Sequence, residues 1–224
     1  MSAGAPLFDW RFAWATLPAL RRALGVTLEA VAAGMTLALG LGLVWAVARR
    51  AAPRWIARAV DLWVELIRST PLLIQLYFLY FVMPEAGVRM SALLTGILGL
   101  GLHYSTYTAE VYRAGIEAVP EGQWEAARAL GLSGRRTWLA VILPQAIPRV
   151  IPALGNYLIA IFKDTPLLSA IAVAELLQTA KIIGAERFRY LEPLTLVGLI
   201  FLVLSLVSAR GISALERRHV VRHA

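Results

Sequence analysis

The chain has 224 residues, of which 59% are hydrophobic and 16% are charged, and its mean hydropathy is +0.67. Soluble domains usually hold about 45–50% apolar residues, so this composition indicates an integral membrane protein with several spans. The net charge of +8 does not indicate nucleic acid, because the basic residues lie between apolar runs and not along one polar face. The lack of cysteine excludes disulfides and thiolate metal sites, and three scattered histidines are too few for a metal cluster.

The amino-terminal region predicts an interfacial segment followed by a first span. Residues 1–22 carry Trp10, Phe12 and Trp14 among charges, and such aromatic residues favour the membrane–water interface. Residues 24–48 then form an apolar run that exceeds the roughly 20 helical residues needed to cross the hydrocarbon layer. No small-residue cleavage site follows a short apolar run, so we expect no cleaved signal peptide.

The second predicted span, 60–83, is divided into two unlike halves. Asp61, Glu65 and Arg68 recur on one helical face of the first half. Residues 69–71, Ser-Thr-Pro, then have the pattern of a helix cap followed by a new helix start. We therefore expect one kinked span with a charged entry half and an apolar second half.

The last part of the third predicted span, 90–109, is unusually polar, in a run that includes His103, Tyr107 and Glu110. Charged groups at the centre of a bilayer cost about 2.5–3.5 kcal/mol on insertion scales. These side chains should therefore face the interior of the bundle or a wet path. His103 taken alone is more often a packed polar group than a ligand.

Three prolines recur at every fourth position in the fourth predicted span, 138–162: Pro144, Pro148 and Pro152. They share one helix face, and each removes a backbone hydrogen bond, so this face should be buried against protein or water. The proline row could form a gate in the pathway; the alternative is that it only bends the helix. Residues 169–190 are amphipathic and predict a helix along the outer surface, and residues 191–209 predict a fifth span.

The most polar long interval of the chain lies at 120–144 and predicts a helix, a sharp corner and a second helix. Pro120 suits a helix start, and Gly131 occupies the place where a helix favours a left-handed residue. Ser133 can then cap the second helix. The first helix should hold about ten residues, or roughly 15 Å. Three alanines leave one of its sides almost bare, so another protein could come close: Ala126, Ala127 and Ala129.

This interval resembles the EAA signature of the membrane subunits of ABC importers. The resemblance rests on Glu125-Ala126-Ala127, Gly131 and the run Val141-Ile142-Leu143-Pro144, in which Val141 stands where Ile is usual. In that family the short helix docks in a groove of the ATPase subunit. The resemblance thus implies the ATPase-coupling residues Trp124, Glu125, Ala126, Ala127, Gly131, Leu143 and Pro144. An amphipathic surface loop that binds nothing is the alternative.

Flanking stretches resemble the permeases for polar amino acids within the same family. They are residues 68–81, residues 107–120 and the run 163–168, in which Pro166 replaces the usual Ser. A zwitterion needs partners of opposite charge in a medium of low dielectric constant, which suggests polar in-span residues as solute contacts. The candidates for the substrate pathway are Glu110, Asp164 and Thr165, followed by Gln75 and Tyr107.

Two of these candidates have structural alternatives. Glu110 could instead pair with Arg113 three residues later, and Asp164 could form an interfacial salt bridge with Lys163. Charge sets the orientation of the chain: with the amino terminus outside, inner segments hold twelve basic residues and outer segments hold seven. The positive-inside rule therefore predicts five spans with the carboxyl terminus in the cytoplasm.

The resemblance covers nearly residues 10–218 and implies the type I ABC importer permease fold: an all-α membrane bundle, 1–224, with a cytoplasmic coupling loop at 115–137. It implies a subunit of the bacterial inner membrane that works with a second permease, identical or paralogous, ATPase subunits and an extracytoplasmic solute-binding protein. The chain lacks a P-loop pattern, so we expect no catalytic residues or cofactor here, and ATP with Mg²⁺ on the partner ATPase.

A stand-alone secondary transporter or channel for a small polar solute is the competing function. Such a protein would lack the docking stretch and would usually show inverted repeats, and no clear repeat is visible here. A membrane-anchored scaffold would need a sizeable soluble domain, and no stretch is long enough.

Overall fold

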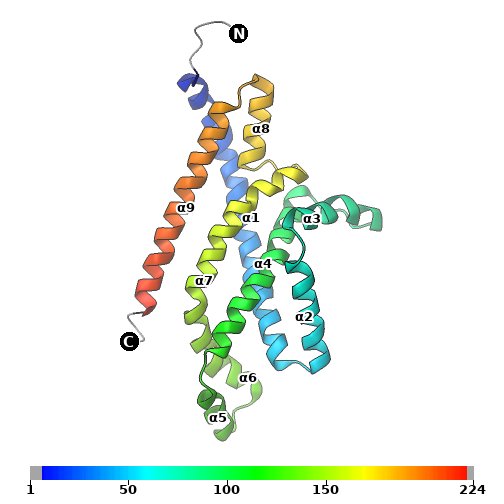
Figure 1. The fold of residues 1–224 in the computed structure, drawn as a ribbon, viewed down its shortest axis with the longest axis vertical. Coiled ribbons are helices and arrows are strands. Elements are labelled where there is room, and N and C mark those ends of the chain that lie inside the picture. Colours follow the sequence, from blue (N-terminus) through cyan, green and yellow to red (C-terminus); the bar gives the residue numbers. More distant parts are fainter. Residues whose placement is uncertain (1–6, 221–224) are drawn as a thin grey trace.

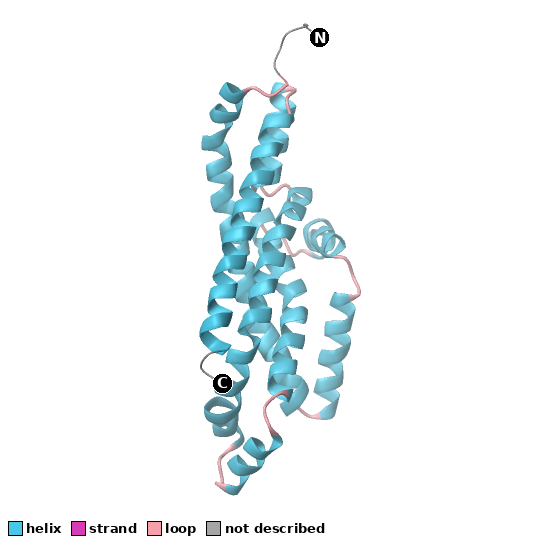
Figure 2. Cartoon of the chain, turned by 60° about the vertical axis from the view of Figure 1, so that its left-hand side comes forward, coloured by secondary structure: helices cyan, strands magenta, loops and turns pink. Residues whose placement is uncertain are grey.

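The computed structural model describes residues 7–220, and these residues form helices joined by short turns, without strands (Figure 2). The all-α prediction is therefore confirmed for this part of the chain. The helices are α1 (Trp10–Ala51), α2 (Arg54–Arg68), α3 (Leu72–Tyr77), α4 (Ala92–Glu117), α5 (Glu121–Ala129), α6 (Gly134–Arg136), α7 (Leu143–Asp164), α8 (Leu176–Arg187) and α9 (Leu191–Val220). Shorter helical segments are Phe78–Val82 and Thr137–Ile142, both π-helical, and Met83–Ala86 and Thr165–Ile171, both 3₁₀.

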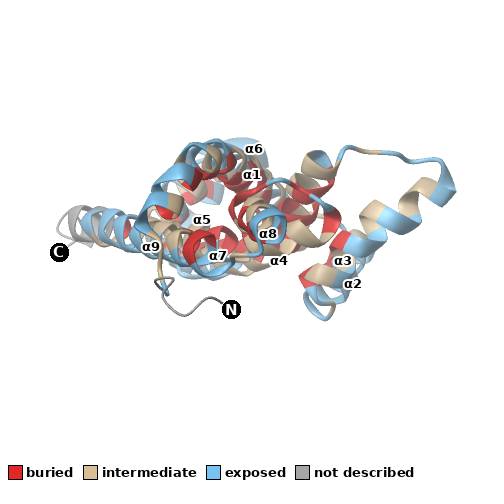
Figure 3. Ribbon diagram, turned by 90° about the horizontal axis from the view of Figure 1, so that it is seen from above, coloured by how far each residue is buried: buried red, intermediate tan, exposed pale blue. Residues whose placement is uncertain are grey.

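Helices α1, α4, α7 and α9 run lengthwise and form an elongated bundle, with α5 and α6 at one end and α8 at the other (Figure 1). Seen from above, the buried residues gather where α1, α4 and α7 meet (Figure 3). Helix α1 approaches α4 closely, because a Cβ atom at Gly42 would lie 2.0 Å from Thr108 Oγ1 and 2.9 Å from the carbonyl oxygen of Ser105. The lack of a side chain at Gly42 therefore allows α1 to pack closely against α4.

Within residues 7–220, three helical stretches are long and apolar enough to cross a membrane: Trp10–Ala51, Gly134–Ile171 and Leu191–Ala214. The bent pair Arg54–Arg68 and Leu72–Ala86 makes a fourth if it counts as one span. Helix α4 spans 26 residues and carries the polar run expected from the sequence. Its hydroxyl residues Ser105, Thr106 and Thr108 are fully buried, and each donates to a backbone carbonyl, at 2.7 Å for Ser105 and Thr106. The polar face of α4 thus turns into the bundle, as predicted.

The second predicted span is broken, which corrects the expectation of a single kinked helix. Segments Arg54–Arg68 and Leu72–Ala86 meet at an angle of 100°. Pro71 has no N–H and disfavours helical backbone at Thr70, so α2 ends at Arg68. The Gln75 amide nitrogen donates to the carbonyl oxygens of Ile67 at 2.7 Å and Thr70 at 3.0 Å, which stabilises the corner.

The start of α1 also differs from the prediction, whereas the predicted helix within 169–190 is present. Helix α1 is continuous from Trp10, because the Asp9 carboxylate caps it by accepting from the backbone N–H of Arg11 and Phe12. The predicted interfacial segment is thus the first part of α1. The amphipathic stretch 169–190 does form a helix, α8, capped by the fully buried Glu175. Burial raises the pKa of Glu175, although its hydrogen bonds from two backbone N–H groups oppose the shift.

The proline row lies at and inside the start of α7. Pro144 occupies the first turn and is exposed, whereas Pro148 and Pro152 are half-buried inside a helix that continues to Asp164. None of the three prolines is fully buried within this chain, so the predicted burial of this face stays a prediction.

Candidate functional site

The coupling interval folds as its sequence predicts. Helix α5 follows Pro120 and ends before Gly131, whose φ is +66°. The Leu132 N–H donates to the Ala127 carbonyl at 3.1 Å, and the Gly131 N–H donates to the Arg128 carbonyl at 3.0 Å, which is the Schellman pattern of a helix end. Ser133 then caps α6 by accepting from the Arg136 N–H at 3.5 Å.

The open face of α5 differs in part from the predicted bare side. Glu125, Ala126 and Ala129 are exposed, but Ala127 is only 2% exposed because it faces the body of the chain. Leu130, at the end of the helix, is 77% exposed. The sequence analysis missed Leu130, although its position four residues after Ala126 places it on the same helical face.

Trp124 belongs to the support of α5. Its ring meets that of Trp138 edge-on, with centroids 5.2 Å apart, and the Arg50 guanidinium lies 5.3 Å above it. The Gln145 amide nitrogen also donates to Gln123 Oε1 at 3.1 Å. The end of α1 and the start of the Thr137–Ile142 segment therefore support the side of α5 that carries Trp124. The predicted coupling residues Leu143, half-buried, and Pro144, exposed, are the first two residues of α7.

A second candidate site is an open hollow of about 450 Å³ at the break between α2 and α3. It brings together residues from three parts of the chain that lie far apart in the sequence. Its lining residues are Arg68, Ser69, Thr70, Pro71, Leu72, Leu73, His103, Tyr107, Asp164 and Leu167. Of the five residues predicted for the substrate pathway, Tyr107 and Asp164 line this hollow.

The hollow presents both signs of charge beside aromatic rings. The Arg68 guanidinium lies 5.4 Å above the Tyr107 ring, within the range of a cation–π contact. The Tyr104 hydroxyl donates to Asp164 Oδ2 at 2.7 Å and fixes this carboxylate. His103 Nδ1 lies 3.2 Å from Gln75 Oε1, so the amide holds the imidazole in place.

Two predicted substrate residues, Thr165 and Gln75, are not part of the lining of the hollow. The Thr165 hydroxyl is buried and donates to the Phe162 carbonyl at 2.8 Å. The amide nitrogen of Gln75 donates to the backbone at the corner between α2 and α3, and its amide oxygen contacts His103. The sequence analysis did not select Arg68, although a charge directly before a Ser-Thr-Pro break was a usable signal.

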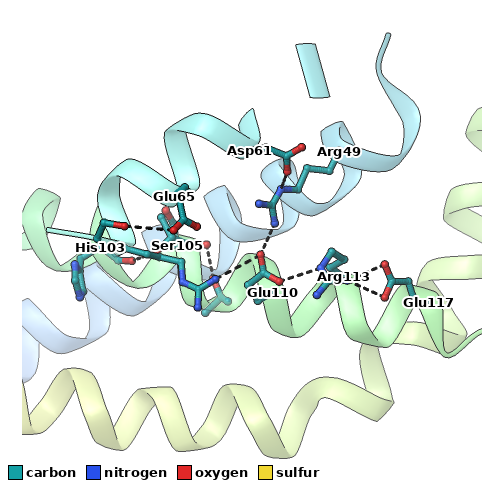
Figure 4. A network of polar contacts seen from close by, with 12 residues as sticks. Arg49, Asp61, Glu65, His103, Ser105, Glu110, Arg113 and Glu117 are labelled. Carbon is teal, nitrogen blue, oxygen red and sulfur yellow. Dashed lines mark hydrogen bonds and ion pairs between the residues drawn. The ribbon is translucent and has the colours of Figure 1, made fainter. Parts of the chain in front are cut away.

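Glu110, the remaining candidate, is the centre of an ion-pair network (Figure 4). Its Oε1 lies 2.5 Å from Arg49 Nη1 and 3.7 Å from Arg68 Nη1, and its Oε2 accepts from Arg113 Nε at 2.9 Å. Arg49 also pairs with Asp61 at 2.7 Å. The predicted alternative, a pair with Arg113, is thus confirmed, and Glu110 joins α1, α2 and α4.

Within residues 7–220 no group of three or more His, Asp or Glu side chains is placed to hold a metal ion.

Known proteins resemble this chain over nearly its whole length. Residues 38–221 match the family described as "Binding-protein-dependent transport system inner membrane component". A probable amino-acid ABC transporter permease protein, y4tG of Sinorhizobium fredii, is 52% identical over 198 residues, which cover 88% of this chain and 86% of that protein. The glutamine transport system permease protein GlnP of Escherichia coli is 36% identical over 214 residues, or 94% of this chain and 97% of that protein.

The fold is also found in solved structures. A chain in a crystal structure of an amino acid ABC transporter with histidines has a TM-score of 0.86 and 34% identity, and the match covers 95% of this chain and 100% of that one. A chain of the inward-facing MetNI methionine ABC transporter shares the fold with a TM-score of 0.66 at 20% identity, covering 93% and 99% of the two chains.

Proposed function

This chain belongs to the family of binding-protein-dependent transport system inner membrane components and is a membrane permease subunit of an ABC importer; we propose that its solute is a polar amino acid or a related zwitterion. Membership of this family decides against a stand-alone secondary transporter or channel. Relatives named for glutamine and arginine transport support the solute class. The observation that carries the proposal is the hollow beside the α2–α3 break.

The hollow offers each charged group of an amino acid a partner. Arg68 can hold the carboxylate with its planar fork, and Asp164 can accept from the ammonium group. Tyr107 and His103 supply aromatic surface beside them. Because charges at membrane depth need partners, a zwitterion fits such a lining better than an apolar or singly charged solute. We assign Thr165 and Gln75 to the support of this lining.

In this proposal the opposite end of the bundle binds the ATPase subunit. An ATPase subunit, which binds ATP with Mg²⁺, docks on the open face of α5 at Glu125, Ala126, Ala129 and Leu130. Trp124, Ala127 and Gly131 keep α5 in place. The chain lies in a bacterial inner membrane with its amino terminus outside and its carboxyl terminus in the cytoplasm, as the positive-inside rule indicates.

A second permease subunit, identical or paralogous, completes the pathway, and an extracytoplasmic binding protein delivers the solute. Closure of the ATPase subunits draws the α5 helices of the two permeases together and opens the hollow to the outside. Hydrolysis then returns the spans and releases the solute inward. This chain itself carries no catalytic step.

Uptake by the complete complex tests the solute assignment. Proteoliposomes with the permease, its ATPase and its binding protein should take up at least one of the twenty L-amino acids when ATP is enclosed. Asp164→Asn should reduce that uptake about tenfold or more, because a hydrogen bond to a charged group is worth about 1.5–3 kcal/mol. Lys163→Gln is the matched control, since Lys163 lies outside the hollow lining. Wild-type uptake by Asp164→Asn would contradict the assignment.

A further inference from the structure

We infer that Arg68 serves two anions in turn, Glu110 and the carboxylate of the solute, so that solute binding loosens the tie between α2 and α4. This inference rests on the proposed function, because it needs a solute with a carboxylate in the hollow. It adds a positioning role for a residue that sequence reasoning did not select.

Arg68 lies where the two sites meet. It is the last residue of α2, directly before the 100° break, and its side chain is 38% exposed. Its Nη1 lies 3.7 Å from Glu110 Oε1, its guanidinium lies over the Tyr107 ring, and it lines the hollow with Asp164. One guanidinium group is therefore within reach of both the Glu110 network and the proposed solute.

Arg68 is the weakest of the three cations around Glu110. Arg49 and Arg113 contact the carboxylate at 2.5 and 2.9 Å, both within hydrogen-bonding distance, whereas 3.7 Å is beyond it. If Arg68 turns toward a carboxylate in the hollow, Glu110 keeps one close cation on each oxygen. The exchange therefore leaves no partly buried charge without a partner. An unpaired buried charge would be costly and would oppose such a movement.

The remaining contacts of the network show which part of α2 would stay in place when Arg68 leaves Glu110. Arg49 of α1 binds Glu110 of α4 and Asp61 of α2, and these contacts do not involve Arg68. Asp61 lies seven residues before Arg68, about two helical turns away. Loss of the Arg68–Glu110 contact thus removes one of the ties between the end of α2 and α4, while Asp61 keeps the rest of α2 near α1. Through Arg68, occupancy of the hollow therefore changes how α2 is held against the α1–α4 core.

If Glu110 and the solute carboxylate compete for Arg68, a change at Glu110 should alter solute binding, which a model of simple contact between Arg68 and the solute does not predict. Glu110→Gln removes the rival anion, so the complex should bind the amino acid severalfold more tightly than wild type. Arg68→Gln should weaken binding about tenfold or more, with partial rescue in Arg68→Lys, which keeps the charge but loses the fork. Neither change should alter binding of the α-carboxamide of the same amino acid, because it presents no carboxylate.

The experiment measures equilibrium binding to the purified permease–ATPase complex. The ligand is the L-amino acid that the wild-type complex takes up fastest, compared with its α-carboxamide, and thermal melting checks that each variant is folded. If Glu110→Gln does not fold, Arg113→Gln supplies the test: loss of a rival cation should strengthen the hold of Glu110 on Arg68 and weaken amino-acid binding. Unchanged or reversed affinities in the folded variant would overturn the competition.

Failure of this inference is distinguishable from failure of the proposed function. If wild type binds and transports an amino acid and Asp164→Asn is defective, the solute assignment stands whatever Glu110→Gln does. Equal losses for the amino acid and its carboxamide in Arg68→Gln would show that Arg68 shapes the hollow without binding the carboxylate, and the inference would be wrong.

Discussion

The coupling end and the hollow are built in opposite ways. Helix α5 with its turn occupies one continuous stretch, and local signals at Pro120, Gly131 and Ser133 determine it. The hollow instead joins the corner after Arg68 to distant residues of α4 and α7. A site formed from one segment tolerates changes elsewhere in the bundle, whereas a site formed from three depends on the packing of all of them.

The largest expected effect follows from that dependence and lies in the contact between α1 and α4. Gly42→Ala places a Cβ atom against Thr108 and the backbone of Ser105, which cannot easily move, so we expect a loss of about 3 kcal/mol or more in stability. Thermal melting and solute binding of the purified complex measure it. Gly40→Ala is the control, because a Cβ atom there meets nothing within 4 Å. Equal melting temperatures for the two variants would contradict this account of the packing.

The next effect concerns the open face of α5. Leu130→Asp should leave the melting temperature nearly unchanged, since Leu130 is exposed, but it should weaken ATPase binding by about 2 kcal/mol or roughly 30-fold. Co-purification of the ATPase and titration of the two subunits measure the loss. Val88→Asp is a control at another exposed apolar residue, in the turn between the Met83–Ala86 segment and α4. An undiminished affinity for the ATPase would remove Leu130 from the docking surface.

A smaller effect is expected where α5 is held from behind. Trp124→Ala removes the edge contact with Trp138 and the cation–π contact with Arg50, together about 1–2 kcal/mol. ATP-driven uptake should fall while amino-acid binding in the hollow stays at the wild-type level. Trp124→Phe keeps an aromatic ring and should recover much of the uptake. A parallel loss of solute binding would show that the two regions are not separable at this residue.

The same contrast explains how far the sequence predicts the molecule. Local rules predicted α5, its glycine turn and the inward polar face of α4, because helix capping and the cost of buried polar groups act on short segments. They did not predict the 100° corner at Pro71, since a proline before an apolar run is compatible with either a kink or a break. The inward position of Ala127, the network around Glu110 and the place of Arg68 depend on which helices pack together, and one sequence does not contain that information.

One measurement tests the separation of the two regions most directly: solute binding and ATPase docking, determined on the same preparations of Asp164→Asn and Leu130→Asp. The account predicts that Asp164→Asn loses solute binding and keeps its ATPase, and that Leu130→Asp loses its ATPase and keeps solute binding. Loss of both properties in either variant, or of neither, would contradict it.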